Sequence, residues 1–405
     1  MRWAKISTEN RRGCIVPRDG HRGRARVICT APSRADAWNA PSIRDGNAHL
    51  QPRPHGFLAP VRPTHGAGWH AAWMGYVVFG AGAIGAVVGG RLFQAGFEVT
   101  LIARGVHLQA LQTNGLRLES PAGTETVDVA AVGHPREIDW VTRQVVLMAV
   151  KSQQSLAALT ELAVVAPPET PIVCLQNGVA NELAALRMFP NVYGVSVACP
   201  TSHLQPGVAQ AWSTPVTGLL DVGRYPTGID QVSEAVAADF RAATFSSYPV
   251  QDIRRWKNRK LLTNLGNAIE AVCGPLERQG PLGDMVLAEG EAALSAAGLE
   301  AATAEEDRDR RADLLQLGKI SGQTRPGGSS WQSLRRATGD IETDYLNGEI
   351  VLLGRMHGVA TPANELLQRL ARELAITRDA PGATPAAAIL ERLEEASKVA
   401  DATFV

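Results

Sequence analysis

Hydrophobic and polar residues follow two different patterns along the chain, and the change falls near Pro249. Up to that point, short apolar runs are separated by glycine, proline and asparagine, which predicts buried strands alternating with helices. Beyond it, apolar residues recur at helical spacing, which predicts long helices. We therefore expect an α/β domain of the Rossmann type over residues 74–249, an all-α domain over residues 250–380 and a tail over residues 381–405.

The α/β part opens with an apolar strand, Tyr76–Phe79, then a glycine-rich turn, a helix ending near Gln94 and a second strand over Glu98–Ala103. In this order a G-x-G-x-x-G turn predicts a dinucleotide site, because its glycines allow a tight turn, close approach of a pyrophosphate and close packing of the helix. The free N–H groups at the helix start can bind phosphate. The alternative is a purely structural glycine turn. The turn residues are Gly80, Ala81, Gly82, Ala83, Ile84 and Gly85.

Arg104 follows the second strand, where the residue type distinguishes the two nicotinamide dinucleotides. An acid at this position accepts hydrogen bonds from the ribose 2′-hydroxyl of NAD, whereas an arginine pairs with the 2′-phosphate of NADP. No acid lies between Val99 and Arg104. The sequence therefore predicts NADP, although an exposed arginine at a strand end would look the same.

Two further apolar strands, Gln144–Val150 and Pro171–Leu175, are followed by the polar residues Lys151 and Asn177. The carboxyl ends of parallel strands line the ligand crevice of such a sheet. We expect Lys151 to meet a cofactor phosphate and Asn177 to reach the nicotinamide ribose and the substrate. A solvated strand end and an ordinary Asn-Gly turn are the alternatives.

The all-α part begins with a predicted helix over Ile253–Cys273, in which Lys260, Asn264 and Asn267 stand at i, i+4 and i+7. This spacing places the three polar side chains on one narrow face. Burying them is costly unless they bind a ligand or one another, so this face is predicted to bind substrate. Lys260 could donate the proton that a ketone oxygen needs during reduction. A surface lysine is the alternative, because the helix start is basic: Arg254, Arg255, Lys257 and Arg259.

Two later segments add candidate polar groups. Ser329 and Ser330, in the run Gly327–Leu334, could bind a carboxylate together with helix-start N–H groups, or could simply cap the helix. Glu342 could hydrogen-bond the lysine or a cofactor ribose, or could be an acid favoured by the helix dipole.

The composition argues against several kinds of partner and site. The 405 residues carry 40 basic and 40 acidic side chains, so net charge does not argue for a nucleic-acid partner. The five cysteines form no CxxC pair, so neither a zinc ribbon nor a disulfide framework is indicated, and a reducing cytoplasm fits best. The uncharged stretch between His70 and Arg91 contains six glycines and is interpreted as the nucleotide-binding turn, not a membrane span.

Residues 1–73 have a composition of their own, with 12 basic residues against four acids, seven prolines and seven glycines. Such a segment buries too little apolar surface to offset the entropy of ordering it, so disorder is predicted. Met74 stands directly before the first strand, and we interpret it as the alternative translation start. A transit peptide is a weaker interpretation, because the prolines interrupt any amphipathic stripe.

The ordered set of these motifs resembles the ketopantoate reductase family over residues 75 to about 375. The resemblance is carried by the GAGAIG turn, Arg104, Lys151, Gln176–Gly178, the K-x3-N of Lys260 and Asn264, Ser330, and the E-x-D-Y-x-N-G run from Glu342. It implies a Rossmann domain joined to a helical domain like the C-terminal domain of 6-phosphogluconate dehydrogenase. It also implies NADPH-dependent reduction of 2-dehydropantoate to pantoate, and often a homodimer.

The resemblance implies a role for each matching residue. Arg104 and Lys151 would lie near the adenosine phosphates, and Asn177 near the nicotinamide. Lys260 would be the proton donor, and Glu342 would contact the cofactor and steady the site. The residues implied to bind the substrate's carboxylate and hydroxyl are Asn177, Lys260, Asn264, Asn267, Ser330 and Ser333.

The sequence departs from the family in ways that concern the substrate. The second asparagine of the family lies eight residues after the lysine, where this chain has Ala268, and Asn267 comes one residue early. A different small 2-oxo acid, a 3-hydroxy acid or an opine therefore stays open as substrate. The alternative function that is not enzymatic is a redox sensor that binds NADP without turnover.

Overall fold

The computed structural model describes residues 75–141 and 143–403. The segment 1–73 and Met74, for which disorder and an alternative start are predicted, lie outside the described residues. No helix of the described part is both long and apolar enough to cross a bilayer.

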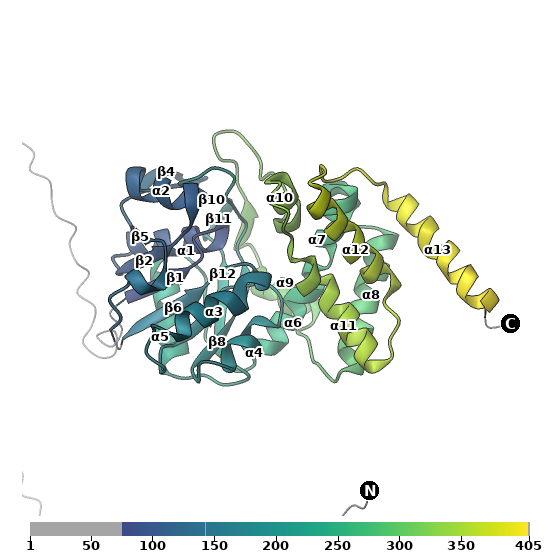
Figure 1. Ribbon diagram of the computed structural model, residues 1–405, viewed down its shortest axis with the longest axis horizontal. Coiled ribbons are helices and arrows are strands. Elements are labelled where there is room, and N and C mark those ends of the chain that lie inside the picture. The colour runs from purple at the N-terminus through teal and green to yellow at the C-terminus, as the bar shows by residue number, and fades with distance from the viewer. Residues whose placement is uncertain (1–74, 142, 404–405) are drawn as a thin grey trace, which may run out of the picture. The chain divides into compact units, whose positions relative to one another are not determined.

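The N-terminal half is built on a seven-stranded sheet with the order β12-β8-β7-β6-β1-β2-β5 (Figure 1). All neighbouring strands are parallel except β12, which runs antiparallel to β8. This is the Rossmann-type sheet that the alternation of apolar runs predicts. The strands are β1 (Gly75–Phe79), β2 (Val99–Ile102), β5 (Ala130–Val132), β6 (Gln144–Met148), β7 (Ile172–Cys174), β8 (Val192–Ala198) and β12 (Leu219–Arg224).

Helices cover both faces of this sheet, which explains why its central strands are apolar at every position. Alternate residues of β1 enter two different cores: Tyr76 and Val78 pack on one face, and Val77 and Phe79 on the other. The helices of this half are α1 (Ala83–Gln94), α2 (Gly105–Asn114), α3 (Ser155–Ala163), α4 (Asn181–Leu186) and α5 (Gln231–Ala242).

A second, four-stranded sheet, which the sequence pattern did not predict, packs against α1. Gly90 permits this contact, because a Cβ there would lie 2.7 Å from a methyl carbon of Leu118. The strands, in sheet order, are β4 (Gly123–Val127), β3 (Leu116–Ser120), β10 (Val208–Ala211) and β9 (Thr201–Ser202).

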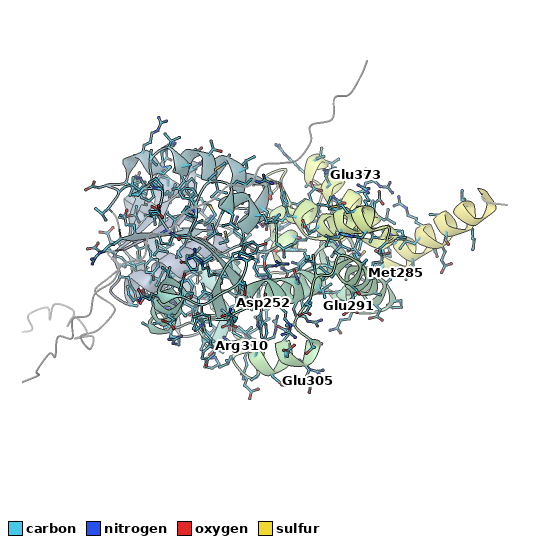
Figure 2. The ribbon with its side chains drawn as sticks, turned by 90° about the horizontal axis from the view of Figure 1, so that it is seen from below. Asp252, Met285, Glu291, Glu305, Arg310 and Glu373 are labelled. Carbon is cyan, nitrogen blue, oxygen red and sulfur yellow. The ribbon has the colours of Figure 1, made fainter. Side chains whose placement is uncertain are left out.

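The C-terminal half is helical apart from β13 (Leu315–Leu317), which pairs with β11 (Ser213–Pro215) of the N-terminal half. Arg310, near the end of α9 and labelled in Figure 2, also forms a 2.7 Å salt bridge with Asp221 of β12, so this region is attached to the Rossmann sheet. The helices are α6 (Ile253–Asn264), α7 (Gly266–Cys273), α8 (Pro281–Ala296), α9 (Ala304–Arg311), α10 (Ser329–Arg335), α11 (Asn347–His357), α12 (Pro362–Thr377) and α13 (Ala386–Thr403).

The prediction of one continuous helix over Ile253–Cys273 was wrong, because the helix is interrupted at Leu265 between α6 and α7. The carbonyl of Thr263 accepts a 2.6 Å hydrogen bond from Arg278. In an uninterrupted helix that carbonyl would accept from the backbone N–H of Asn267. A side chain that inserts into the series of backbone hydrogen bonds of a helix in this way is a recognised cause of a helix break.

The predicted tail contains α13, which packs on α8 (Figure 1). Ile389 is fully buried in the helical core, and Leu390 and Leu393 are partly buried against it. The helical spacing of these residues in the sequence therefore corresponds to one packed face of α13.

Candidate functional site

A cleft of about 640 Å³ lies between the two halves. One wall is formed by the glycine turn after β1 and the segments after β6 and β7, which are the carboxyl ends of parallel strands. The opposite wall is formed by α6, α7, η4 (Pro275–Arg278) and α10. Its position at the strand ends is where ligands bind in sheets of this kind.

The glycine turn leaves the backbone open to the cleft. Gly80 has φ +104°, and a Cβ there would lie 2.8 Å from the amide nitrogen of Val150. A Cβ on Gly85 would lie 2.1 Å from the carbonyl oxygen of Gly80, so α1 can approach the turn only because Gly85 has no side chain. A Cβ on Gly82 would meet nothing within 4 Å. The turn therefore fits close approach of a pyrophosphate, as predicted for a dinucleotide.

Of the six turn residues, four line the cleft, namely Gly80, Gly82, Ala83 and Ile84. Ala81 and Gly85 are buried behind them. Arg104 lies at the end of β2, where its side chain is 68% exposed and pairs with Glu161 at 3.0 Å. An exposed ion pair of this kind is weak, so the guanidinium can exchange Glu161 for an anionic ligand.

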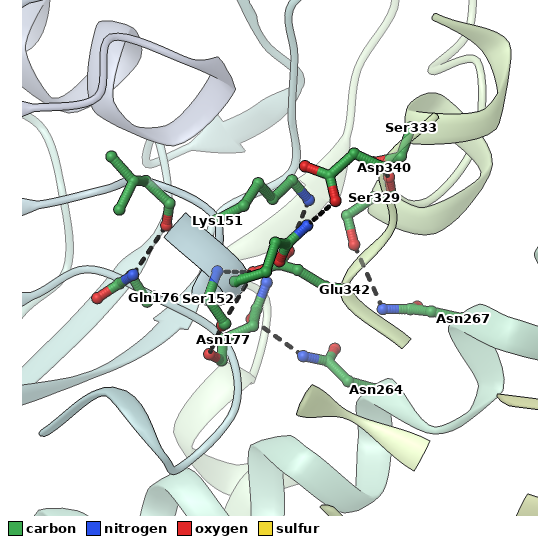
Figure 3. Close-up of polar contacts among 12 residues, drawn as sticks. Lys151, Ser152, Gln176, Asn177, Asn264, Asn267, Ser329, Ser333, Asp340 and Glu342 are labelled. Carbon is green, nitrogen blue, oxygen red and sulfur yellow. Dashed lines mark hydrogen bonds and ion pairs between the residues drawn. The ribbon is translucent and has the colours of Figure 1, made fainter. Parts of the chain in front are cut away.

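Lys151 and Glu342 form an ion pair between the two halves (Figure 3). Lys151 follows β6, and Glu342 begins η5 (Glu342–Tyr345) in the helical half. Their N–O distance is 2.5 Å, and the second carboxylate oxygen accepts from the backbone N–H and the hydroxyl of Ser152, each at 3.1 Å. In the described residues Glu342 thus bonds Lys151 and Ser152, and of the alternatives left open for it, the hydrogen bond to Lys260 is not formed.

Lys260, Asn264 and Asn177 form a chain of hydrogen bonds across the cleft. Lys260 Nζ donates to Asn264 Oδ1 at 3.1 Å. Asn264 Nδ2 in turn donates to Asn177 Oδ1 at 2.9 Å, the bond drawn between these two residues in Figure 3. Lys260 is half-buried, and this burial, together with the charges of Arg311, Arg278 and Arg325, lowers its pKa to about 7. An amine with such a pKa can donate a proton near neutral pH.

Asn267 completes the polar face predicted from the sequence, even though it belongs to α7 and not α6. Its Nδ2 lies 3.5 Å from the hydroxyl of Ser329, and its Oδ1 accepts from Arg278 at 2.9 Å. Ser329 and Ser333, both on α10, line the cleft (Figure 3). Ser330 is buried and does not line it, so of the two neighbouring hydroxyls predicted to bind a carboxylate only Ser329 lines the cleft.

Two family models match this chain. The model described as "Ketopantoate reductase PanE/ApbA" matches residues 76–223, and "Ketopantoate reductase PanE/ApbA C terminal" matches residues 252–375. Together they span more than half of the chain. The chain belongs to the ketopantoate reductase family.

Individual relatives agree with this membership. The chain is 26% identical to the 2-dehydropantoate 2-reductase of Pyrococcus horikoshii over 73% of its own length and 95% of the relative's. It is 29% identical to the 2-dehydropantoate 2-reductase of Mycobacterium tuberculosis H37Rv, over 76% of this chain and 99% of the relative.

Solved structures share the fold. The ketopantoate reductase of Ralstonia eutropha is 29% identical, with a TM-score of 0.62 over 75% of this chain and 99% of that one. A D-mandelate dehydrogenase solved with NADH and anilino(oxo)acetate has a TM-score of 0.64, over 75% of this chain and 99% of that one. Its sequence identity is 20%, so the likeness shows the fold alone.

In this member of the family, several residues near the cleft were not predicted from the sequence. Lys257, one of the basic residues at the start of the predicted helix, is buried and pairs with Glu182 at 2.7 Å. Arg278, Arg311, Arg325 and Arg336 line the cleft. They belong to no motif, and surface arginines have the same local pattern, so no signal in the sequence distinguished them.

Proposed function

We propose that this protein uses NADPH to reduce the carbonyl group of a 2-oxo acid, with Lys260 as the proton donor. The observation that carries the proposal is the position of Lys260: its ammonium faces the cleft that the glycine turn lines, with a pKa of about 7. A reduced ketone oxygen must receive a proton, and a donor with a pKa near the working pH is the most effective.

The open backbone at Gly82 supports binding of a dinucleotide pyrophosphate at the start of α1. Arg104 would pair with a 2′-phosphate, and Asn177 would lie beside the nicotinamide end. Bound NADPH would supply the hydride. Lys151 is held by Glu342, whose other carboxylate oxygen accepts from the Ser152 hydroxyl, and this would place the Lys151 ammonium between the cofactor and the helical half.

The polar face of α6 and α7 accounts for the rest of the proposed chemistry. Asn264 accepts from Lys260 Nζ and so directs the ammonium toward the cleft. The proton then passes from Nζ to the carbonyl oxygen of the substrate. Asn267 and Ser329 place polar groups beside it for the substrate's carboxylate. Because the chain belongs to the ketopantoate reductase family, 2-dehydropantoate is the first substrate to test.

The direct test is consumption of NADPH by the full chain, followed by absorbance at 340 nm, with 2-dehydropantoate and with other 2-oxo acids. We expect NADPH-dependent reduction of at least one 2-oxo acid, with the 2-hydroxy acid as product. Tight NADPH binding without turnover of any 2-oxo acid would contradict the proposed function and favour a redox sensor.

Arg104→Ser tests the choice of cofactor. We expect the KM for NADPH to rise about tenfold to a hundredfold, since a hydrogen-bonded charge pair contributes about 1.5–3 kcal/mol. The KM for NADH should change little. Arg117→Ser is the matched control, because Arg117 is also an exposed arginine paired with a glutamate, Glu119. Equal effects on both cofactors would contradict a 2′-phosphate contact.

A further inference from the structure

The wall of the cleft around Lys260 carries three arginines from separate segments. Arg278 ends η4, Arg311 ends α9, and Arg325 lies in the segment between β13 and α10. All three line the same cleft as Lys260. Each lowers the pKa of Lys260 through its charge, in addition to the larger effect of burial. Four cationic groups therefore act on one region of the cleft.

The three arginines differ in how their charges are balanced. Arg278 is held by Asn267, by the Thr263 carbonyl and by Glu270, whose carboxylate lies 3.6 Å away. Arg311 uses its Nε to pair with Asp307 at 2.9 Å.

Arg325 is not balanced in this way. Its Nε is buried without a hydrogen-bond partner in the described part of the chain, and no carboxylate of that part lies within ion-pair distance. Glu270 acts on it only at longer range. A buried, unpaired guanidinium nitrogen is costly, and such a cost is expected where a ligand supplies the missing partner.

The local charges do not cancel. Lys260 and the three arginines face two neighbouring carboxylates, Glu270 and Asp307, which leaves two positive charges when Lys260 is protonated. A monocarboxylate would neutralise one of them. A dicarboxylate would neutralise both, and guanidinium groups bind carboxylates through two parallel hydrogen bonds.

The cofactor does not account for this cluster. Its proposed phosphate contacts come from the turn after β1, from Lys151 and from Arg104, all in the Rossmann half, whereas the arginines belong to segments that follow α7 in the helical half. Lowering the pKa of Lys260 does not account for it either, because burial is already the larger cause.

From this geometry we propose that the substrate is a 2-oxo dicarboxylate, whose second carboxylate binds Arg325 and Arg311. The inference rests on the proposed function and names its substrate class. The first carboxylate would lie by Asn267 and Ser329, so that the 2-oxo group faces Lys260. The reaction is balanced: the carbonyl carbon gains a hydride from NADPH, its oxygen gains the Lys260 proton, and solvent returns a proton to the amine.

The test compares pairs of substrates that differ in one group. 2-Oxoglutarate and 2-oxopentanoate have the same five-carbon chain and differ in a carboxylate against a methyl group, as oxaloacetate and 2-oxobutanoate do at four carbons. We expect kcat/KM to be about a hundredfold higher for the better diacid than for its monoacid partner, the effect of a buried charge-assisted pair. 2-Dehydropantoate, a monoanion, should be the poorer substrate too.

Arg325→Gln and Arg311→Gln test whether these two arginines cause the preference for the diacid. Each should raise the KM for the diacid about tenfold or more and leave the monoacid KM within about threefold, since only the diacid loses a charge pair. Arg392→Gln, an exposed arginine on α13, is the matched control and should change neither. Calorimetric binding of 2-hydroxyglutarate to the NADP⁺ complex gives a second readout that does not need turnover.

Two results would overturn the inference. If the monoacid or 2-dehydropantoate is reduced as well as the diacid, the substrate class is wrong although the proposed function stands. If no 2-oxo acid is reduced and 2-hydroxyglutarate does not bind, both the inference and the proposed function fail.

Discussion

We expect Lys260→Ala to lower kcat by about a hundredfold or more, because general acid catalysis typically contributes a factor of about 10² to 10⁴. The ammonium is the only group of the described cleft that combines a proton to donate, a pKa of about 7 and a hydrogen bond to Asn264 that fixes its direction. The measurement is steady-state NADPH oxidation at saturating 2-oxo acid, together with the dissociation constant for NADPH. The latter should change little, since the glycine turn is untouched.

The dependence of kcat/KM on pH distinguishes a chemical role of Lys260 from a structural one. Because the protonated amine is the donor, kcat/KM of the unmodified protein should be constant below the pKa and fall about tenfold per pH unit above pH 7. Lys260→Ala should lose this alkaline limb. Lys398→Ala, an exposed lysine on α13, is the control and should retain both rate and profile. Near-normal turnover by Lys260→Ala would exclude the proposed proton donor.

We expect Lys257→Met to lower the free energy of unfolding by about 3–5 kcal/mol, the usual cost of removing one partner of a buried ion pair. The side chains of Lys257 and Glu182 are 3% and 0% exposed, and their N–O distance is 2.7 Å. Methionine fills a similar volume, so the loss comes from the Glu182 carboxylate that stays buried without its partner. Urea unfolding followed by circular dichroism measures it.

Two further variants define the origin of that loss. Lys257→Met combined with Glu182→Leu should recover much of the stability, because no uncompensated charge is left. Arg355→Met breaks the exposed pair with Glu365 and should cost no more than about 1 kcal/mol. A double variant as unstable as Lys257→Met alone would show that packing, and not the unpaired carboxylate, is responsible.

The same buried pair connects stability with the site. Lys257 Nζ also donates to the backbone carbonyl of Gln176 at 2.8 Å, directly before Asn177. Asn177 in turn accepts from Asn264, which holds Lys260. One lysine of α6 therefore fixes the strand end that carries Asn177, and a second lysine of the same helix faces the cleft.

Four central strands of the Rossmann sheet and the dinucleotide turn could be predicted from the sequence because their causes are local. Burial on both faces makes β1 and β6 apolar at successive positions, and the absence of a Cβ at Gly80 and Gly85 is visible in the residue type itself. The spacing of Lys260, Asn264 and Asn267 is local too. The shared face survives the break at Leu265, whose backbone keeps right-handed helical dihedral angles, and all three residues line the cleft.

The residues that these side chains contact could not be predicted from the sequence, because the contacts join segments that are distant along the chain. Ser329 and Ser330 are equivalent in sequence, and only the packing of α10 decides that Ser329 faces the cleft. Lys257 and Arg259 belong to one basic run, yet only Lys257 meets Glu182.

By itself, then, the amino-acid sequence determined the two-part architecture, the nucleotide turn and the polar face that α6 and α7 share. Each of these depends on residues within one or two helical turns or strands. Tertiary structure alone decided which charges surround Lys260. Arg278, Arg311 and Arg325 come together because η4, α9 and the segment after β13 fold against one cleft. Electrostatic interaction depends on distance in space, and separation along the chain does not reveal that distance.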